Sequence, residues 1–106
     1  MRKVLLIIIG LFLSIIFFEN ISGQEKKDDN FYLGSGLVKY YNNDYIGAIK
    51  DFSKAIELNP KNGLAYLRRG IANIKNKRKK EGCLDLSKAG EMGIEEAYEF
   101  IRVFCN

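Results

Sequence analysis

The stretch that decides the fold is Asp44-Tyr-Ile-Gly-Ala-Ile-Lys-Asp-Phe-Ser-Lys-Ala-Ile-Glu-Leu-Asn-Pro60. Its apolar side chains recur at the spacing of one face of an α-helix, and this stripe comprises Ala48, Ile49, Phe52, Ala55 and Ile56. Asp44 can cap the start, because its carboxylate can accept the unpaired N–H groups of the first turn. Pro60 cannot continue a helix, so it marks the end. The stretch therefore predicts one amphipathic helix with a defined start and stop.

The same stretch is the second half of a unit that recurs 34 residues later. Residues 31–60 aligned with residues 65–94 share nine identities, among them Gly36 with Gly70 and Asp51 with Asp85. Apolar stripes predict three further helices within the two units, and a last stripe predicts a helix that covers the end of the second unit. We expect these four helices at Phe31–Asn42, Leu64–Lys75, Lys79–Glu91 and Ile94–Phe104. Glycine weakens a helix by about 1 kcal/mol relative to alanine, so Gly36 and Gly70 predict points where a second helix comes close.

Residues 36–60 resemble a tetratricopeptide (TPR) motif, a helix–turn–helix repeat with a 34-residue period. The small residue, Asp-Tyr turn, two alanines, bulky residue and closing proline of the family occur in order, at Gly36, Asp44-Tyr45, Ala48, Phe52, Ala55 and Pro60. Residues 66–93 resemble a weaker copy, with Gly82 and Leu86 in place of the alanine and the aromatic residue, and residues 89–97 also resemble Sel1-like repeats. The chain is thus similar to small secreted bacterial TPR proteins with a Sel1-like C-terminal part. The resemblance implies an all-α fold of TPR-like helical hairpin repeats, an α-solenoid, with a C-terminal capping helix.

The N-terminal residues have the layout of a secretory signal peptide. A short basic start precedes the apolar run 4–18, and a polar segment with small residues follows. We expect cleavage after Gly23, and an uncleaved inner-membrane anchor is the alternative, although the run is shorter than the roughly 20 residues of a typical span. The expected domains are a signal peptide 1–23, a flexible linker 24–30, repeats 31–62 and 63–93, and a cap helix 94–105. The protein would then be exported to a periplasmic or extracellular space.

The composition does not favour catalysis. The chain has no histidine and a net charge of +4. It shows no acidic cluster at metal-ligand spacing, no phosphate-binding glycine loop and no nucleophile beside a base. We therefore expect no enzyme activity, no metal and no cofactor. Asp51 and Asp85 recur one repeat apart, too far for an acid–base pair, and are interpreted as structural partners of Arg69 or nearby lysines.

The TPR resemblance implies a concave groove lined by the first helix of each repeat. On this chain the lining residues would be Leu33, Leu37, Tyr40, Tyr41, Leu67, Arg68, Ile71, Ile74 and Lys75. Some family members clamp a carboxylate there with Lys and Asn, but Leu33 and Leu37 stand at the first two of those positions, so we do not predict that clamp. The mostly apolar lining would accept a helix or extended segment of an unidentified protein or peptide. Self-association into a homodimer through the same surface is the alternative.

The turn inside the second repeat carries a further prediction. The turn at Lys77-Arg78-Lys79-Lys80 replaces the Asn43-Asp44 of the first repeat, and it places cations at the positive end of a helix dipole, which is unfavourable. It suggests an anionic partner, such as an acidic protein or membrane head groups. The other interpretation is a solvated turn. Nucleic acid is not expected, because no aromatic residue lies among these cations.

Cys83 and Cys105 are the only cysteines, and an exported chain meets an oxidising compartment. The helices that carry them should be antiparallel, which brings both residues to the same end of that hairpin. We expect a disulfide that fastens the cap helix. Two buried thiols are the alternative.

Overall fold

The computed structural model describes residue 3, residues 7–11 and residues 26–106. The expected signal peptide or anchor at residues 1–23 lies largely outside these ranges. Within them, no helix combines the length and the hydropathy that crossing a membrane requires.

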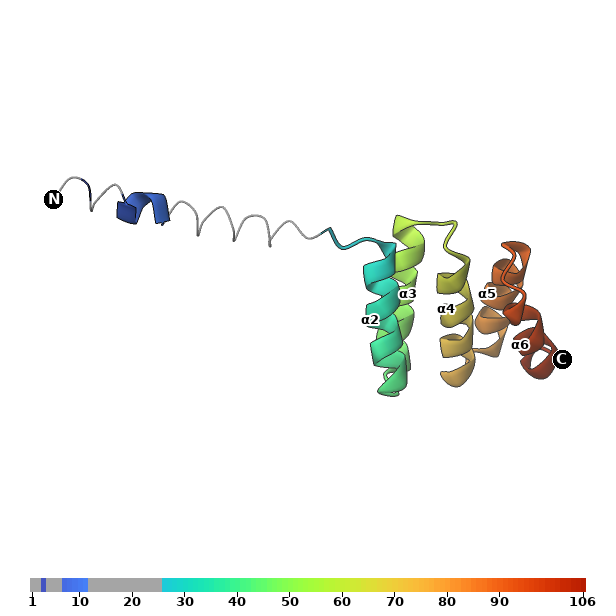
Figure 1. The fold of residues 1–106 in the computed structure, drawn as a ribbon. Coiled ribbons are helices and arrows are strands. Elements are labelled where there is room, and N and C mark those ends of the chain that lie inside the picture. Colours follow the sequence, from blue (N-terminus) through green and yellow to red (C-terminus); the bar gives the residue numbers. More distant parts are fainter. Residues whose placement is uncertain (1–2, 4–6, 12–25) are drawn as a thin grey trace.

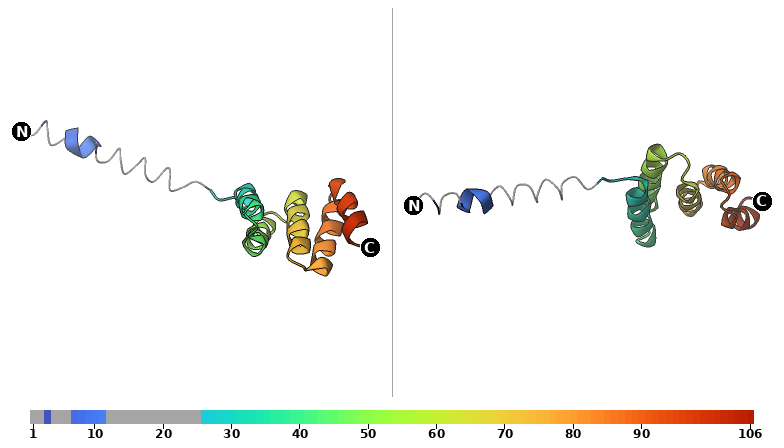
Figure 2. Two further views of the ribbon diagram at one scale, coloured as in Figure 1. Left: turned by 90° about the horizontal axis from the view of Figure 1, so that it is seen from below. Right: turned by 45° about the horizontal axis from the view of Figure 1, so that its top comes forward.

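Residues 26–106 fold as a row of antiparallel helices (Figure 1). These helices are α2 (Asp29–Tyr41), α3 (Tyr45–Leu58), α4 (Gly63–Lys75), α5 (Lys79–Glu91) and α6 (Glu96–Phe104). Helices α2 and α3 form one hairpin, α4 and α5 the next, and α6 packs against α5. The views in Figure 2 show the hairpins stacked side by side along the row. The expected all-α, TPR-like repeat fold is confirmed.

Helix boundaries follow local capping. The Gly47 N–H donates to Asp44 Oδ1 at 2.9 Å, and α3 ends at Leu58, two residues before the proline. Helix α2 begins two residues earlier than the apolar stripe predicts, because Asp28 caps it by accepting the Phe31 N–H at 2.9 Å. The last two residues of the expected linker, residues 29 and 30, are therefore helical.

In each hairpin the two helices come close together at a glycine, but the atoms that meet there differ between the two hairpins. In the first hairpin the Phe52 ring fills the space beside Gly36, where an added Cβ would lie 2.6 Å from ring atom Cδ1. In the second hairpin an added Cβ on Gly82 would lie 2.7 Å from the carbonyl oxygen of Gly70. Backbone therefore meets backbone in the second hairpin, because Gly82 and Leu86 occupy less space than Ala48 and Phe52 in the equivalent positions.

A carboxylate is bound at the same place in both hairpins. Asp51 Oδ2 accepts the Ser35 hydroxyl at 2.6 Å and the Lys39 ammonium at 2.8 Å. One period later, Asp85 accepts two hydrogen bonds from Arg69, at 2.7 and 2.8 Å, and one from Asn73 at 3.1 Å. Both aspartates thus join the two helices of their own hairpin, as the structural interpretation of the sequence expected.

Arg69 also connects the two repeats. Its Nη1 donates to Ser53 Oγ at 3.2 Å, so a single guanidinium bonds α3 and α5 from its position on α4. The hydrogen bond and charge of Asp85 raise the pKa of Arg69, which remains protonated. For Asp51, burial alone would raise the pKa, but the hydrogen bonds from Lys39 and Ser35 outweigh it and hold the pKa below its ordinary value.

Candidate functional site

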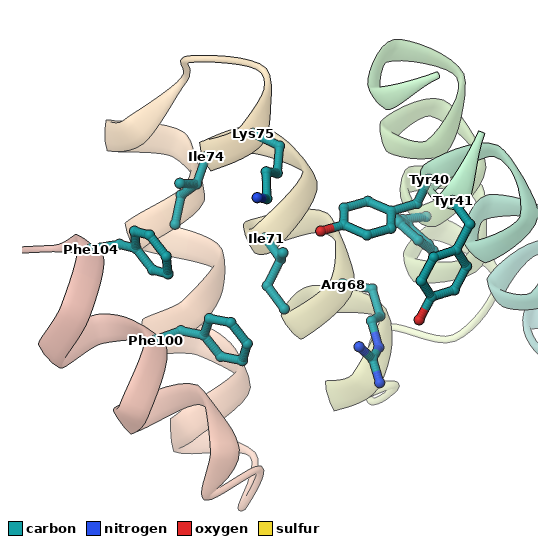
Figure 3. Close-up of a pocket in the computed structure, with 9 residues that line it drawn as sticks. Tyr40, Tyr41, Arg68, Ile71, Ile74, Lys75, Phe100 and Phe104 are labelled. Carbon is teal, nitrogen blue, oxygen red and sulfur yellow. The ribbon is translucent and has the colours of Figure 1, made fainter. Parts of the chain in front are cut away.

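A hollow of about 340 Å³ lies on one face of the row of helices, between α2 and α6 and across α4. Its lining is contributed by four helices and comprises Tyr40, Tyr41, Phe52, Arg68, Ile71, Ile74, Lys75, Phe100 and Phe104. Figure 3 shows the tyrosines of α2 on one side of α4 and the phenylalanines of α6 on the other. The hollow therefore depends on both repeats and on the last helix.

Helical spacing brings these side chains to one face. Arg68, Ile71 and Lys75 follow one another at three and four residues along α4, and such positions share a face. Phe100 and Phe104 are one turn apart on α6, and their rings stack with centroids 6.2 Å apart. Ile71, Ile74 and Phe100 are half-buried, because they also pack against the core cluster around Leu67 and Leu86. The floor of the hollow is thus held in place by the core.

The edges of the hollow are open to solvent. Tyr41 is 73% exposed and Phe104 is 40% exposed, so an apolar contact is available on each side. Tyr40 packs against the cluster of Ala48, Phe52 and Ala72 and makes edge-on contact with Tyr41 and Tyr45 at centroid distances of 5.5 Å. Burial raises the pKa of Tyr40, so its phenol stays neutral at physiological pH and can donate a hydrogen bond.

The charge of the hollow is positive. No acidic residue lines it, and neither Arg68 nor Lys75 forms an ion pair with any residue in the described part of the chain. The adjacent Arg69, in contrast, is fully engaged with Asp85 and Ser53. An apolar surface with two available cations can bind a segment that carries both apolar side chains and carboxylates.

The structure brings together six of the nine groove residues that the sequence suggested: Tyr40, Tyr41, Arg68, Ile71, Ile74 and Lys75. The other three do not line the hollow. Leu33 and Leu37 pack against the cluster of Ala48, Phe52 and Ala72, and Leu67 is fully buried in the second cluster. Leu33 and Leu37 are half-buried by these contacts, which involve both α3 and α4, whereas Leu67 is a core residue.

Sequence reasoning missed three lining residues, Phe52, Phe100 and Phe104. The last helix was interpreted only as a cover for the second repeat. The i, i+4 spacing of Phe100 and Phe104 was a usable signal, since it places two large apolar side chains on one face of the last helix. Phe52 was correctly assigned to the core, and it also closes the bottom of the hollow.

The two turns inside the hairpins have the same backbone and different chemistry. Asn43 and Lys77 both adopt the left-handed conformation, with φ of 63° and 64°. The following N–H donates to the equivalent carbonyl in each turn, from Asp44 to Lys39 at 2.9 Å and from Arg78 to Asn73 at 2.8 Å. Asp44 caps its helix through its side chain, whereas Arg78 forms no capping hydrogen bond. Losing such a cap costs about 1 kcal/mol.

Cys83 and Cys105 form a disulfide, with a Cα–Cα distance of 5.8 Å. It joins α5 to the residue that follows α6, so the last helix is held covalently against the second repeat. Among the residues that the structure describes, no group of three or more His, Cys, Asp or Glu side chains could hold a metal ion.

One part of the chain matches a known protein family. A TPR repeat family model matches residues 36–77, from the middle of α2 to the turn after α4. No curated protein and no solved structure matches the chain. The match and the helical hairpins support a TPR protein and indicate a protein–protein interaction module, a class that is generally not catalytic. The matched region ends before residues 89–97, so the Sel1-like resemblance there stays a prediction from the sequence.

Proposed function

We propose that this protein binds a segment of a partner protein in the hollow between α2, α4 and α6, in an extracytoplasmic compartment. The observation that carries the proposal is the placement of Tyr41 and Phe104. Both aromatic side chains remain exposed on opposite sides of a floor that the core holds in place. Exposed aromatic residues around a concave apolar surface are typical of binding sites.

The chemistry of the hollow describes the segment it would bind. Apolar side chains would contact Ile71 and the phenylalanines of α6, and a carboxylate would lie near Arg68 or Lys75. The volume of about 340 Å³ accommodates a few side chains, so a short helix or an extended peptide fits better than a globular surface.

The test is affinity capture from an extract of the native host, with the wild type beside a Tyr41→Glu/Phe104→Glu variant. Both positions are exposed, so the variant should fold, and the new carboxylates oppose an acidic, apolar segment. The matched control is Val38→Glu/Val103→Glu, which changes the same two helices at positions that are 63% and 65% exposed and do not line the hollow. A partner that the wild type and the control retain, and the variant loses, supports the proposal. Equal retention by all three contradicts it.

Self-association is the second candidate, and the outer face of α2 favours it. Phe31 and Val38 are exposed there, although Ala65 and Ala72 at the equivalent positions of the second repeat are fully buried. The first repeat thus presents larger apolar side chains where the second repeat packs against its neighbour. Sedimentation equilibrium would decide: a dimer that Phe31→Glu/Val38→Glu dissociates supports association through α2, and a monomer at all concentrations excludes it.

The extracytoplasmic setting rests on the N-terminal sequence, and the disulfide is compatible with it. Mass spectrometry of the protein from its native host would test the setting. A mass lacking residues 1–23 supports an exported soluble protein. Retention of these residues would instead indicate an adaptor tethered to the membrane through residues 4–18.

A further inference from the structure

The turn between α4 and α5 carries a patch that the hollow does not include. We define the basic patch as Lys77, Arg78, Lys79, Lys80 and Leu84. All five side chains are exposed, and none of them lines the hollow. The four cations form no ion pair within the described part of the chain. Among residues 26–106, the one hydrogen bond that a side chain of these cations forms is from Lys79 Nζ to the Asn106 carbonyl oxygen, at 3.2 Å.

The first repeat shows that the fold does not require these cations. Its equivalent turn has the same left-handed residue and the same backbone hydrogen bonds, with Asn43 and Asp44 in place of Lys77 and Arg78. There the aspartate caps the next helix, which the arginine does not do. The patch therefore lacks a capping interaction that the other turn has, and packing offers no reason for its charge.

An exposed leucine lies among the cations. Leu84 lines one surface depression with Arg78 and Glu81 and another with Lys79 and Lys80. Glu81 is an exposed acidic residue beside the patch, and the four cations outnumber it. An apolar side chain surrounded by lysine and arginine suits a membrane interface, where the cations meet lipid phosphates and the leucine enters the boundary with the acyl chains. The expected signal peptide or anchor also brings the chain to a membrane, at least during export. We propose that the basic patch docks this protein onto an anionic lipid surface.

The experiment measures how the full-length chain distributes between two competing vesicle populations, one of phosphatidylcholine alone and one that also contains phosphatidylglycerol. The ratio isolates the contribution of anionic lipid, because any insertion of residues 4–18 contributes to both populations. The test variant is Lys77→Asn/Arg78→Asp, which gives the second turn the residues of the first. The control, Lys50→Asn/Lys61→Asp, removes the same charge at exposed positions away from the patch.

The wild type should prefer the anionic vesicles at low salt and lose the preference at high salt. The test variant should reduce the preference on the order of 100-fold, since it lowers the charge of the patch by three units and each unit near the surface contributes about fivefold. It should also unfold at a higher temperature than the wild type, because it regains an N-cap, so misfolding cannot explain the loss. The control should retain most of the preference.

Three results would overturn this inference: no preference in the wild type, an unchanged preference in the test variant, or an equal loss in the control. Binding of an acidic peptide in place of the vesicles would also overturn it and assign the patch to a protein. The Tyr41→Glu/Phe104→Glu variant should dock normally, so this inference and the proposed function can fail separately.

Discussion

Gly82→Ala should destabilise the protein, although alanine is the better helix former. Gly82 lies inside α5, where the helix passes close to α4. An added Cβ would lie 2.7 Å from the Gly70 carbonyl oxygen and 2.6 Å from Ile74 Cγ1. The isoleucine side chain can move, but the carbonyl oxygen belongs to the backbone of α4. The two helices would have to separate.

Two opposing contributions decide the size of the effect. Alanine in place of glycine gains about 1 kcal/mol of helix propensity. Forcing an extra carbon into a packed contact costs about 1–3 kcal/mol, and separating the helices also loosens the packing around Leu86, which is fully buried. We therefore expect the free energy of unfolding to fall by about 1–2 kcal/mol.

The first repeat supplies a compensating change. There Ala48 occupies the position of Gly82, and the larger Phe52 occupies the position of Leu86 and faces Gly36. Adding Leu86→Phe to Gly82→Ala should therefore recover part of the loss, with a coupling free energy of at least about 0.5 kcal/mol.

Urea unfolding followed by circular dichroism measures these free energies for the wild type, both single variants and the double variant. A stabilising Gly82→Ala would refute the reasoning, because it would show that helix propensity outweighs the backbone contact. Strict additivity of the two changes would refute the link between residue size and helix spacing.

Three further results are expected. Arg69→Met should lower the free energy of unfolding by about 3 kcal/mol in urea titrations, because it leaves the buried Asp85 with one donor, and adding Asp85→Leu should restore much of it. Cys83→Ser/Cys105→Ser should cost about 3 kcal/mol for a bond that closes 22 residues, and non-reduced wild-type protein should contain no free thiol. Asp51 has a pKa below its ordinary 3.8 in the folded state, so its contribution to stability is present above that pH and is lost as the pH falls below it. The difference in stability between the wild type and Asp51→Asn should therefore shrink below pH 3.8, and a constant difference would contradict the assignment.

The helices were predictable because their signals are local. The Asp44 cap and Pro60 depend only on neighbouring residues, and both act as expected at the ends of α3. The start of α2 was less clear, since the apolar stripe begins at Phe31 while the helix is capped by Asp28. Asp29 then accepts hydrogen bonds from Asn59 and Asn62, which lie a full hairpin away in sequence. That contact exists only once the first two helices have paired and the chain has turned toward α4.

The hollow was only partly predictable, because its lining depends on helix rotation within the packed repeats. A 3.6-residue period identifies an apolar face but does not say which part faces the partner helix and which part faces solvent. Leu67 and Ile71 lie one turn apart, yet the first is fully buried and the second lines the hollow. The contribution of Phe104 required the position of α6, which the disulfide and the packing against α5 determine.

Site-specific photocrosslinking in the native host tests the binding account most directly. A photoreactive amino acid would replace Tyr41 or Phe104 in the hollow, and Val38 or Val103 at exposed positions on the same two helices outside it. The account predicts that the two hollow positions crosslink to the same partner protein and that the two outer positions do not. Crosslinks to that partner from the outer positions alone, or no crosslink at the hollow positions, would contradict it.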